Sequence, residues 1–510
     1  MTPPPFWQKR RSARRGMNIN DRLKGMKNNN KKQGIVANFF WKFAERVGAQ
    51  FVTLVVSIVL ARILSPEHYG TISIILVCIN LADVFIASGF TAALVQKKDS
   101  DDLDFSTIFY FNLLFSLVLY GILFVCAPFV ERYFGLPDLA LAIQILGLKI
   151  PVSAFNSIQQ AYVAKKMIFR KLFWATFGGT VASAVVGIWM ACNGYGVFAL
   201  VGQYLTNGII GTLMLWFVIG WRPILKFSFF RFKGLYSYGW RNLVTHLVRT
   251  LYDDIYSLVI GKKYSSADLA FYTKGKQYPN LIVHNLNTAL CSVLFPAFVQ
   301  YQDDIPKLKL SLQRAIRLGS YILSPFLVGL AVCAEPFVKL LLTEKWLECV
   351  PYLQIVCLYQ LLIPMSSSNL QVVKSLGRGD ILLKLEITKR VVGILILLVS
   401  MQFGVLAVAI GAALATFFNS CADVAATKKL VNYSYREQIL DILGSVSLAF
   451  IMGILVYGFK FLIKNAALLL VVQVLVGAVV FVFLSYITKN ESFLYVLGVV
   501  KEKLHINKKV

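Results

Sequence analysis

The chain is patterned as a long series of apolar segments separated by short polar connections. The apolar runs are about twenty residues long, enough to cross roughly 30 Å of hydrocarbon as helices. Strands of a membrane barrel would instead alternate over about ten residues, so the pattern predicts an all-α integral membrane protein. We predict about fourteen transmembrane helices, at residues 39–64, 70–92, 107–130, 139–163, 172–192, 196–220, 242–262, 278–299, 317–342, 350–374, 381–402, 404–427, 440–462 and 466–488.

These segments repeat in two halves. Residues 59–62, Val-Leu-Ala-Arg, return about 200 positions later as residues 259–262, Val-Ile-Gly-Lys. Further matches keep the same order: Trp41-Lys42 with Trp240-Arg241, Pro128-Phe129-Val130 with Pro336-Phe337-Val338, Pro151, Ser153 and Asn156 with Pro364, Ser366 and Asn369, and Gly196-Val197 with Gly404-Val405. Collinear matches predict two pseudo-symmetric six-helix bundles, a parallel repeat typical of transporters, followed by two extra C-terminal helices.

The repeat and the connections divide the chain into six parts. They are a basic disordered cytoplasmic arm (1–34), an N-terminal six-helix bundle (35–220), an interfacial amphipathic linker (221–241), a C-terminal six-helix bundle (242–430), two additional transmembrane helices (431–488) and a basic cytoplasmic tail (489–510). The linker mixes aromatic and basic side chains, which is typical of a helix lying in the membrane interface. Capture of a polyprenyl chain is the alternative interpretation of the same residues.

Composition and charge agree with this map. Hydrophobic residues make up 57% of the 510 residues, and 52 Lys and Arg against 25 Asp and Glu give a net charge of +27. Residues 1–34 alone hold ten basic residues against one acid, and basic residues favour every second connection. The positive-inside rule then places both termini in the cytoplasm of a multi-pass protein. No folded module accompanies the basic arm, so nucleic acid is not a predicted partner.

Little in the sequence favours catalysis. The eight cysteines are scattered without a CxxC pair or zinc-ligand spacing, so neither a metal site nor a cofactor is predicted. The chain lacks a GxxxxGK[ST] phosphate loop and a GxSxG elbow. No connection is long enough for the external domain that usually carries the carboxylates of membrane glycosyltransferases. We therefore predict that the protein is not an enzyme.

Charged residues inside the predicted helices are the candidate functional groups. Each would cost about 2.5 kcal/mol or more facing lipid at mid-depth, so deep charges should face a cavity or one another. Arg46 and Arg249 lie about 10 Å into the first helix of their respective halves. The candidate substrate-binding cations are Arg46, Arg249, Lys42 and Arg390, and the candidate coupling or gating acids are Asp83, Asp253 and Glu386.

Structural roles compete with these functional ones. Arg249 and Asp253 are four residues apart, as are Glu386 and Arg390, so each pair could be an internal ion pair. Lys42, Asp423 and Glu335 lie near helix ends, where extension of the side chain to the interface is the simpler interpretation. His284 is expected to make hydrogen bonds between helices. Lys345 is predicted to lie in a loop, where its replacement by Ala should leave transport unchanged.

Three motifs resemble a known family. Residues 60–70 read LARILSPEHYG, residues 89–96 read GFTAALVQ, and residues 127–130 read APFV before the YFG of residues 133–135. From about residue 35 to 430 the chain resembles the polysaccharide-export branch of the MOP superfamily, the Wzx-like flippases of O-antigen, capsule and teichuronic acid pathways. His68 and Tyr69 depart from the family pattern, which has an acidic and an aromatic residue there.

The resemblance implies a MATE-like fold and a function. Such a protein moves an undecaprenyl-pyrophosphate-linked oligosaccharide from the cytoplasmic to the outer leaflet of the bacterial plasma (inner) membrane, for biosynthesis of surface polysaccharide such as lipopolysaccharide. A proton or sodium gradient is the expected energy source, and polysaccharide polymerase and chain-length proteins are candidate partners. Two alternatives remain: a MATE-type cation-coupled drug antiporter, and a non-transporting scaffold of envelope assembly.

Overall fold

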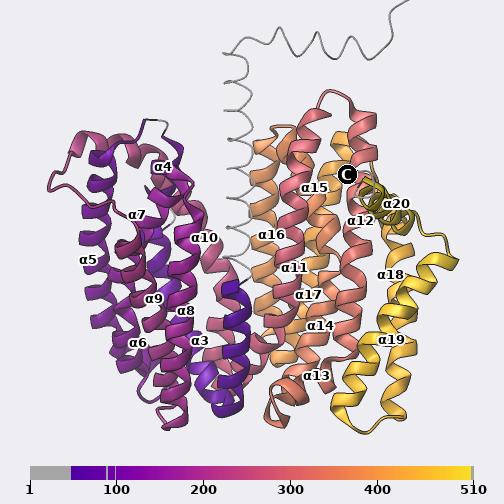
Figure 1. The fold of residues 1–510 in the computed structure, drawn as a ribbon, viewed down its shortest axis with the longest axis horizontal. Coiled ribbons are helices and arrows are strands. Elements are labelled where there is room, and N and C mark those ends of the chain that lie inside the picture. The colour runs from indigo at the N-terminus through magenta and orange to yellow at the C-terminus, as the bar shows by residue number, and fades with distance from the viewer. Residues whose placement is uncertain (1–47, 88–89, 98, 507–510) are drawn as a thin grey trace, which may run out of the picture. The chain divides into compact units, whose positions relative to one another are not determined.

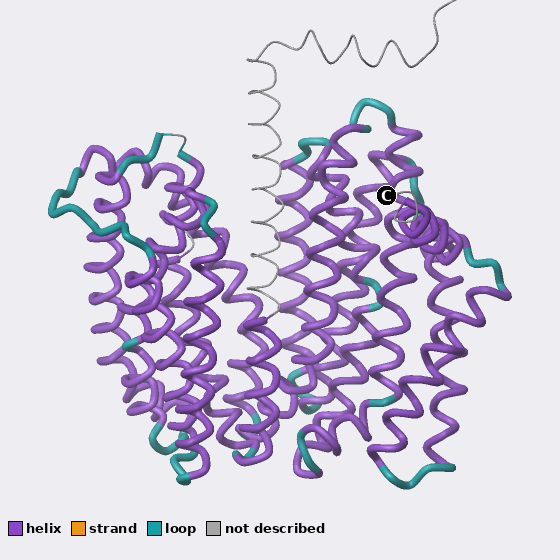
Figure 2. The backbone as a smooth tube through the Cα atoms, in the orientation of Figure 1, coloured by secondary structure: helices purple, strands orange, loops and turns teal. Residues whose placement is uncertain are grey.

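The computed structural model describes residues 48–87, 90–97 and 99–506, which form helices and loops without a strand (Figures 1 and 2). A helix over Gly48–Ile63 comes first. It is followed by α3 (Pro66–Ala87), α4 (Phe90–Gln96), α5 (Asp102–Phe134), α6 (Leu139–Gly147), α7 (Lys149–Lys166), α8 (Phe169–Cys192), α9 (Val197–Val218), α10 (Phe229–Lys263), α11 (Ser266–Gln300), α12 (Ile305–Val332), α13 (Ala334–Leu341), η1 (Glu344–Cys349), α14 (Val350–Gln360), α15 (Ile363–Ser375), α16 (Gly379–Ser400), α17 (Val405–Val431), α18 (Tyr435–Gly458), η2 (Phe459–Phe461), α19 (Ala466–Ile487) and α20 (Glu491–Ile506).

The spans agree closely with the hydrophobic pattern. Ten helices of the described chain are long and apolar enough to cross a membrane, and the bent pair formed by residues 344–375 makes eleven. The three remaining predicted spans correspond to the short helix Gly48–Ile63 and to α10 and α16. Both α10 and α16 carry the charged residues singled out above. Four of the candidate functional charges therefore lie on these two helices, whereas Asp83 lies on the apolar span α3.

The chain forms two compact units. The first contains Ile79–Ala127, Ala140–Val248 and the described residues up to Ser57, and the second contains Ile58–Cys78, Pro128–Leu139 and the chain from Arg249 onward. Helices α3, α5 and α10 therefore contribute residues to both units. The predicted bundle boundaries at 35–220 and 242–430 stay a prediction, because two segments of the first half pack in the second unit.

The first unit is held by close helix packing and an aromatic cluster. Gly179 of α8 lies directly against Gly211 of α9, where a Cβ atom at position 179 would approach the backbone of Gly211 to 2.9 Å. Phe109 of α5 packs edge to face on Phe155 of α7, and the ring centre of Trp216 of α9 lies 5.9 Å from that of Phe109. These contacts fix α7, α8 and α9 relative to one another.

In the second unit, residues of the first half pack against elements of the second. The Trp346 indole is fully buried and donates a 2.8 Å hydrogen bond to the carbonyl of Ala61. Arg62 donates to the carbonyls of Leu340 and Leu341 at the end of α13. Lys345 in turn donates to the carbonyls of Arg62 and Leu64, at 2.9 and 2.7 Å. Each helix end thus receives a cation at its C-terminal carbonyls, which is the favourable arrangement.

The predicted interfacial linker differs from the structure. Residues 221–228 are not helical, and α10 then runs without a break from Phe229 to Lys263. Pro223 lies in the non-helical part, whereas nothing between 229 and 263 removes a backbone donor, so the linker and the seventh span form one helix. Arg231 anchors its start by pairing with Asp101 and Asp104. The hydrogen bond from Arg231 holds the pKa of the Asp101 carboxyl below its usual value.

Candidate functional site: a polar pocket in the first unit

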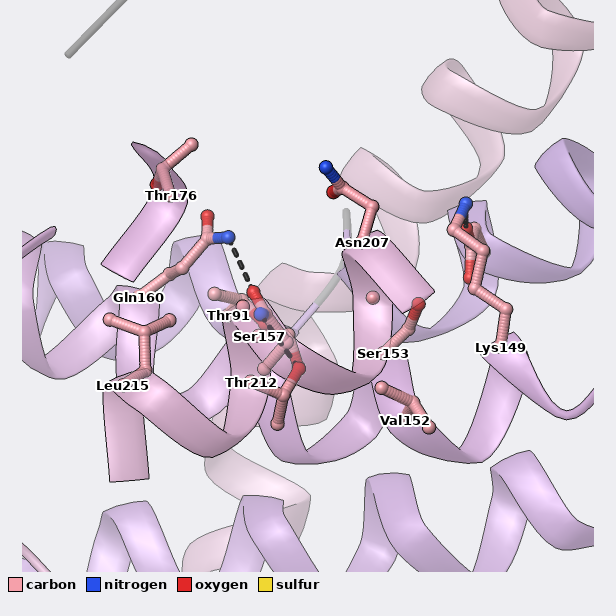
Figure 3. Close-up of a pocket in the computed structure, with 14 residues that line it drawn as sticks. Thr91, Lys149, Val152, Ser153, Ser157, Gln160, Thr176, Asn207, Thr212 and Leu215 are labelled. Carbon is pink, nitrogen blue, oxygen red and sulfur yellow. Dashed lines mark hydrogen bonds and ion pairs between the residues drawn. The ribbon is translucent and has the colours of Figure 1, made fainter. Parts of the chain in front are cut away.

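A polar pocket of about 330 Å³ lies among α3, α4, α7, α8 and α9 in the first unit (Figure 3). Its lining consists mainly of hydroxyl and amide side chains with one acid and one base. The lining residues are Asp83, Thr91, Lys149, Val152, Ser153, Asn156, Ser157, Gln160, Thr176, Asn207, Gly208, Gly211, Thr212 and Leu215. A polar concavity between apolar helices is unusual in a membrane protein, and it marks a candidate site.

One face of α7 supplies much of the polar lining. Lys149, Ser153, Asn156 and Gln160 are spaced by four, three and four residues, so their side chains follow one another along the same side of the helix. In Figure 3, Gln160, Ser153 and Lys149 follow one another across the view, with Asn207 and Thr212 of α9 nearby. A helix with this polar stripe needs polar or hydrated surroundings on that side, and the pocket provides them.

Hydrogen bonds hold the amide side chains in defined orientations. Asn156 donates through Nδ2 to Thr212 Oγ1 at 2.9 Å, and Gln160 donates through Nε2 to Asn156 Oδ1. Asn207 donates to the hydroxyls of Thr180 and Ser183 at 3.4 and 3.3 Å. The lining is therefore pre-organised by contacts between α7, α8 and α9.

Asp83 and Lys149 form the charged end of the pocket. Lys149 Nζ lies 3.0 Å from Asp83 Oδ2, and the two side chains are 24% and 22% exposed. The second oxygen of Asp83, Oδ1, and the hydroxyl of Thr91 are buried without a hydrogen-bond partner among the described residues. Buried oxygens in this state are costly unless something else supplies a donor.

Small residues leave room in the pocket. A Cβ atom at Gly211 would have no neighbouring atom within 4 Å beyond its own surroundings on the helix. The Cβ direction at this position therefore leads into free space, although Gly211 itself is buried against α8. Enlarging this residue would reduce the pocket without an immediate clash at the Cβ atom.

Four of the predicted site residues form a second cluster on α10 and α16. Arg249 and Asp253 are 3.7 Å apart and largely exposed, and Arg390 and Glu386 are 3.3 Å apart. The Arg390 guanidinium also lies 4.9 Å from the ring centre of Tyr252. The structure thus brings the two predicted ion pairs into one group with no net charge. Arg46 and Lys42 lie outside the described residues.

Sequence reasoning misjudged two residues that it placed at helix ends or in loops. Asp423 was expected to extend to the interface, but it is 1% exposed and pairs with Lys389 of α16 and the Ser366 hydroxyl of α15. Asp423 lies near the end of its predicted span, and no pattern within α17 indicates the cation on the neighbouring helix α16. Lys345 was predicted to lie in a loop, but it belongs to η1 and caps the end of the first described helix. Glu335 instead pairs with Lys460 at 2.6 Å near the surface.

The pocket itself was also missed. Of the lining residues, only Asp83 was among the predicted site residues, because Asn156, Gln160 and Asn207 are neutral and look ordinary in isolation. The 4-3-4 spacing of polar residues on α7 was the available signal, since an apolar span has no other reason to carry four polar residues on one side.

Comparison with known proteins adds the family. A family model described as "Polysaccharide biosynthesis protein" matches residues 59–351. The chain belongs to this family. The match covers the LARILSPEHYG motif and confirms the resemblance to polysaccharide-export proteins of the MOP superfamily.

Two individual relatives and one solved structure are also similar to this chain. The chain is 24% identical to the succinoglycan biosynthesis transport protein ExoT of Rhizobium meliloti, over 68% of this chain and 70% of the relative. It is 26% identical to the lipopolysaccharide biosynthesis protein WzxC of Escherichia coli, over 79% and 85%. The inward closed structure of the lipid II flippase MurJ superposes with a TM-score of 0.72 at 14% identity, covering 89% of this chain and 99% of that one. This similarity confirms the predicted all-α, MATE-like fold class.

Proposed function

We propose that the protein is a flippase for undecaprenyl-pyrophosphate-linked glycan repeat units, which it moves from the cytoplasmic to the outer leaflet by alternating access. The product would serve surface polysaccharide biosynthesis at the bacterial plasma membrane. Membership of a polysaccharide biosynthesis family supports a role in the export of polysaccharide or its precursors. A relative named as a transport protein and a fold shared with a lipid II flippase support the choice of a lipid-linked cargo.

The observation that carries the proposal is the polar pocket inside a bundle of apolar helices. A sugar head group that entered hydrocarbon would lose its hydrogen bonds to water, at a cost of several kcal/mol for each unpaired group. Hydroxyl and amide side chains such as Asn156, Gln160 and Asn207 replace those bonds during passage. A lining of this kind suits a polar cargo.

Charged residues complete the proposed mechanism. Arg249 and Arg390 are the described cations that we assign to the pyrophosphate, together with Arg46 and Lys42 beyond the described range. Asp83, Asp253 and Glu386 are the acids that would couple transport to a proton or sodium gradient. Each of these acids has a cation within 4 Å, so binding of an anionic group or a proton would shift an existing balance of charge.

Orientation follows the charge distribution. The basic connections and the basic tail are assigned to the cytoplasm, which attracts them through anionic lipids. Polymerase and chain-length proteins would then act on the flipped product at the outer side.

Export of surface polysaccharide in a strain that lacks the chromosomal copy tests the proposal. We expect Arg249→Ala to reduce export more than tenfold while the amount of protein in the membrane is unchanged, because the 3.7 Å pair with Asp253 is exposed and contributes little to stability. Lys464→Ala, in the loop before α19, is the matched control and should export normally. Accumulation of lipid-linked glycan on the cytoplasmic side should accompany the loss.

Other results would contradict the proposal. Normal export from Arg249→Ala and Arg390→Ala alike would remove these cations from the site. Efflux of cationic drugs that depends on Asp253, with polysaccharide export unaffected by loss of the protein, would favour the drug antiporter. Full export from a variant unable to transport in vesicles would favour the scaffold.

A further inference from the structure

We propose that the pocket in the first unit is a carbohydrate subsite that binds one sugar of the cargo through its hydroxyl groups, apart from the residues that hold the pyrophosphate. This inference rests on the proposed function and adds the chemical class that the pocket selects. It is carried by the chemistry of the lining, by its size and by the contrast with the second half of the chain.

The lining matches the hydrogen-bonding groups of a sugar. Five hydroxyl and three amide side chains face the space, from Thr91 to Thr212. Hydroxyls and amides both donate and accept, as do the hydroxyls of a sugar ring. Val152 and Leu215 add apolar surface for the C–H face of a ring. The buried, unpartnered hydroxyl of Thr91 and Oδ1 of Asp83 belong to the same lining.

The charges of the pocket disfavour a pyrophosphate or a divalent metal cation. Asp83 and Lys149 are the two charged residues of the described lining, and they lie 3.0 Å apart, so their charges compensate. Arginine side chains bind phosphate groups through paired hydrogen bonds, and the lining that the structure describes holds no arginine, whereas the group on α10 and α16 holds two. A divalent cation would need several carboxylate or carbonyl oxygens, whereas Asp83 is the lone acid among the described lining residues. The hydroxyl and amide groups instead suit a neutral, hydroxyl-rich ligand.

The size of the pocket suits one part of a glycan. Its volume of about 330 Å³ is near the lower end of the 300–1,000 Å³ typical of small-molecule sites. The pocket would therefore hold a single sugar and leave the rest of the repeat unit outside. Such a subsite would give the flippase a preference for cargo that carries a particular sugar.

The internal repeat allows a comparison with the second half. Ser153 and Asn156 of α7 correspond to Ser366 and Asn369 of α15. In the second half, the Ser366 hydroxyl bonds Asp423, which also pairs with Lys389, and Asn369 bonds Gln438 at 2.7 Å. In the first half, Asn156 likewise bonds Thr212, but Ser153 lines the pocket. The serine that bonds an acid in the second half thus lines a polar space in the first half.

Binding to the full-length protein in lipid nanodiscs tests the inference. The probes are farnesyl pyrophosphate and three farnesyl pyrophosphates that carry a single glucose, galactose or N-acetylglucosamine. We expect at least one glycosylated probe to bind about tenfold more tightly than the bare probe, the gain of one or two net hydrogen bonds.

Two variants test whether the sugar binds in the pocket. Gly211→Val should abolish the preference for the glycosylated probe and leave the affinity for the bare probe unchanged, because the added methyl groups occupy the pocket. Gly121→Val is the matched control, since a Cβ there also meets no atom within 4 Å but Gly121 lies on exposed α5. Ser153→Ala, which removes one hydroxyl, should reduce the preference severalfold, whereas Ser447→Ala on α18 should not.

The outcomes separate the two proposals. If the protein binds none of the probes, the proposed function is wrong. If it binds bare and glycosylated probes equally, the flippase proposal stands and the sugar subsite is wrong. A sugar preference that survives in both Gly211→Val and Ser153→Ala would place the sugar elsewhere and also overturn the subsite.

Discussion

At the residue scale, two Lys–Asp pairs in this protein differ in burial, and we therefore expect them to contribute differently to the free energy of unfolding. Asp423 is 1% exposed and Lys389 12%, whereas Asp83 and Lys149 are both above 20%. Removing one partner of a buried pair strands the other charge and costs about 3–5 kcal/mol. We expect Lys389→Met to lower the free energy of unfolding by this amount and Lys149→Met to lower it by much less. Thermal unfolding in detergent measures the difference.

The double variant Lys389→Met/Asp423→Leu provides the control for this prediction. Removing both charges leaves no stranded ion, so most of the stability should return. Equal losses from Lys389→Met and Lys149→Met, or no recovery in the double variant, would show that burial does not set the weight of these pairs.

Residue-scale predictions from the sequence succeeded where the partners share one helix. The pairs Arg249–Asp253 and Glu386–Arg390 follow from a spacing of four, and both occur. Asp423–Lys389 and Asp83–Lys149 join different helices, and no pattern within either helix reveals them. The sequence can show that a charge is deep, but the choice of partner depends on how helices are arranged around it.

At the element scale, α8 and α9 both line the pocket, and a contact between two glycines sets the distance between these helices. A Cβ atom at Gly179 would meet Cα and N of Gly211 at 2.9 Å, and neither backbone atom can yield without moving α9. We expect Gly179→Ala to destabilise the protein by about 1–2 kcal/mol, since overpacking outweighs the gain in helix propensity of about 1 kcal/mol. The melting temperature measures the effect.

Gly121→Ala is the matched variant for this contact. Its Cβ atom meets nothing within 4 Å on α5, so only the gain in helix propensity applies and the melting temperature should rise slightly. A destabilisation of the same size in both variants would mean that the contact between α8 and α9 is not what constrains position 179.

Elements were the most predictable level of this protein. Hydrophobic runs identified the spans because the bilayer demands about twenty apolar residues whatever the tertiary fold. The linker was the exception, since a basic and aromatic composition predicts an interfacial position but does not tell whether the helix continues into the next span. In α10 it does, from Phe229 to Lys263.

At the scale of the whole molecule, the internal repeat was informative because it depends on order along the chain and not on contacts. It predicts two related halves from residue matches alone. The sequence does not indicate that residues 58–78 and 128–139 of the first half pack in the second unit. This packing arises from side chains such as Trp346, whose hydrogen bond to Ala61 joins segments 285 positions apart.

The packing of first-half residues in the second unit leads to a prediction about alternating access. Arg62, Lys345 and Trp346 join the two halves of the sequence at the ends of helices that the charge pattern assigns to the outer side. All of these contacts lie within the second unit. If transport requires residues 61–64 to separate from residues 340–346, these hydrogen bonds must break in the outward-open state, so they favour the state in which they are formed. We expect Arg62→Ala/Lys345→Ala to shift the population toward the outward-open state.

Thiol labelling measures this shift. In a background without the eight native cysteines, Ser153→Cys should react faster in the double variant with an impermeant thiol reagent added outside intact cells, and more slowly with the same reagent added to inside-out vesicles. Lys464→Ala should change neither rate. Unchanged labelling from both sides in the double variant would show that these contacts only stabilise the fold of the second unit.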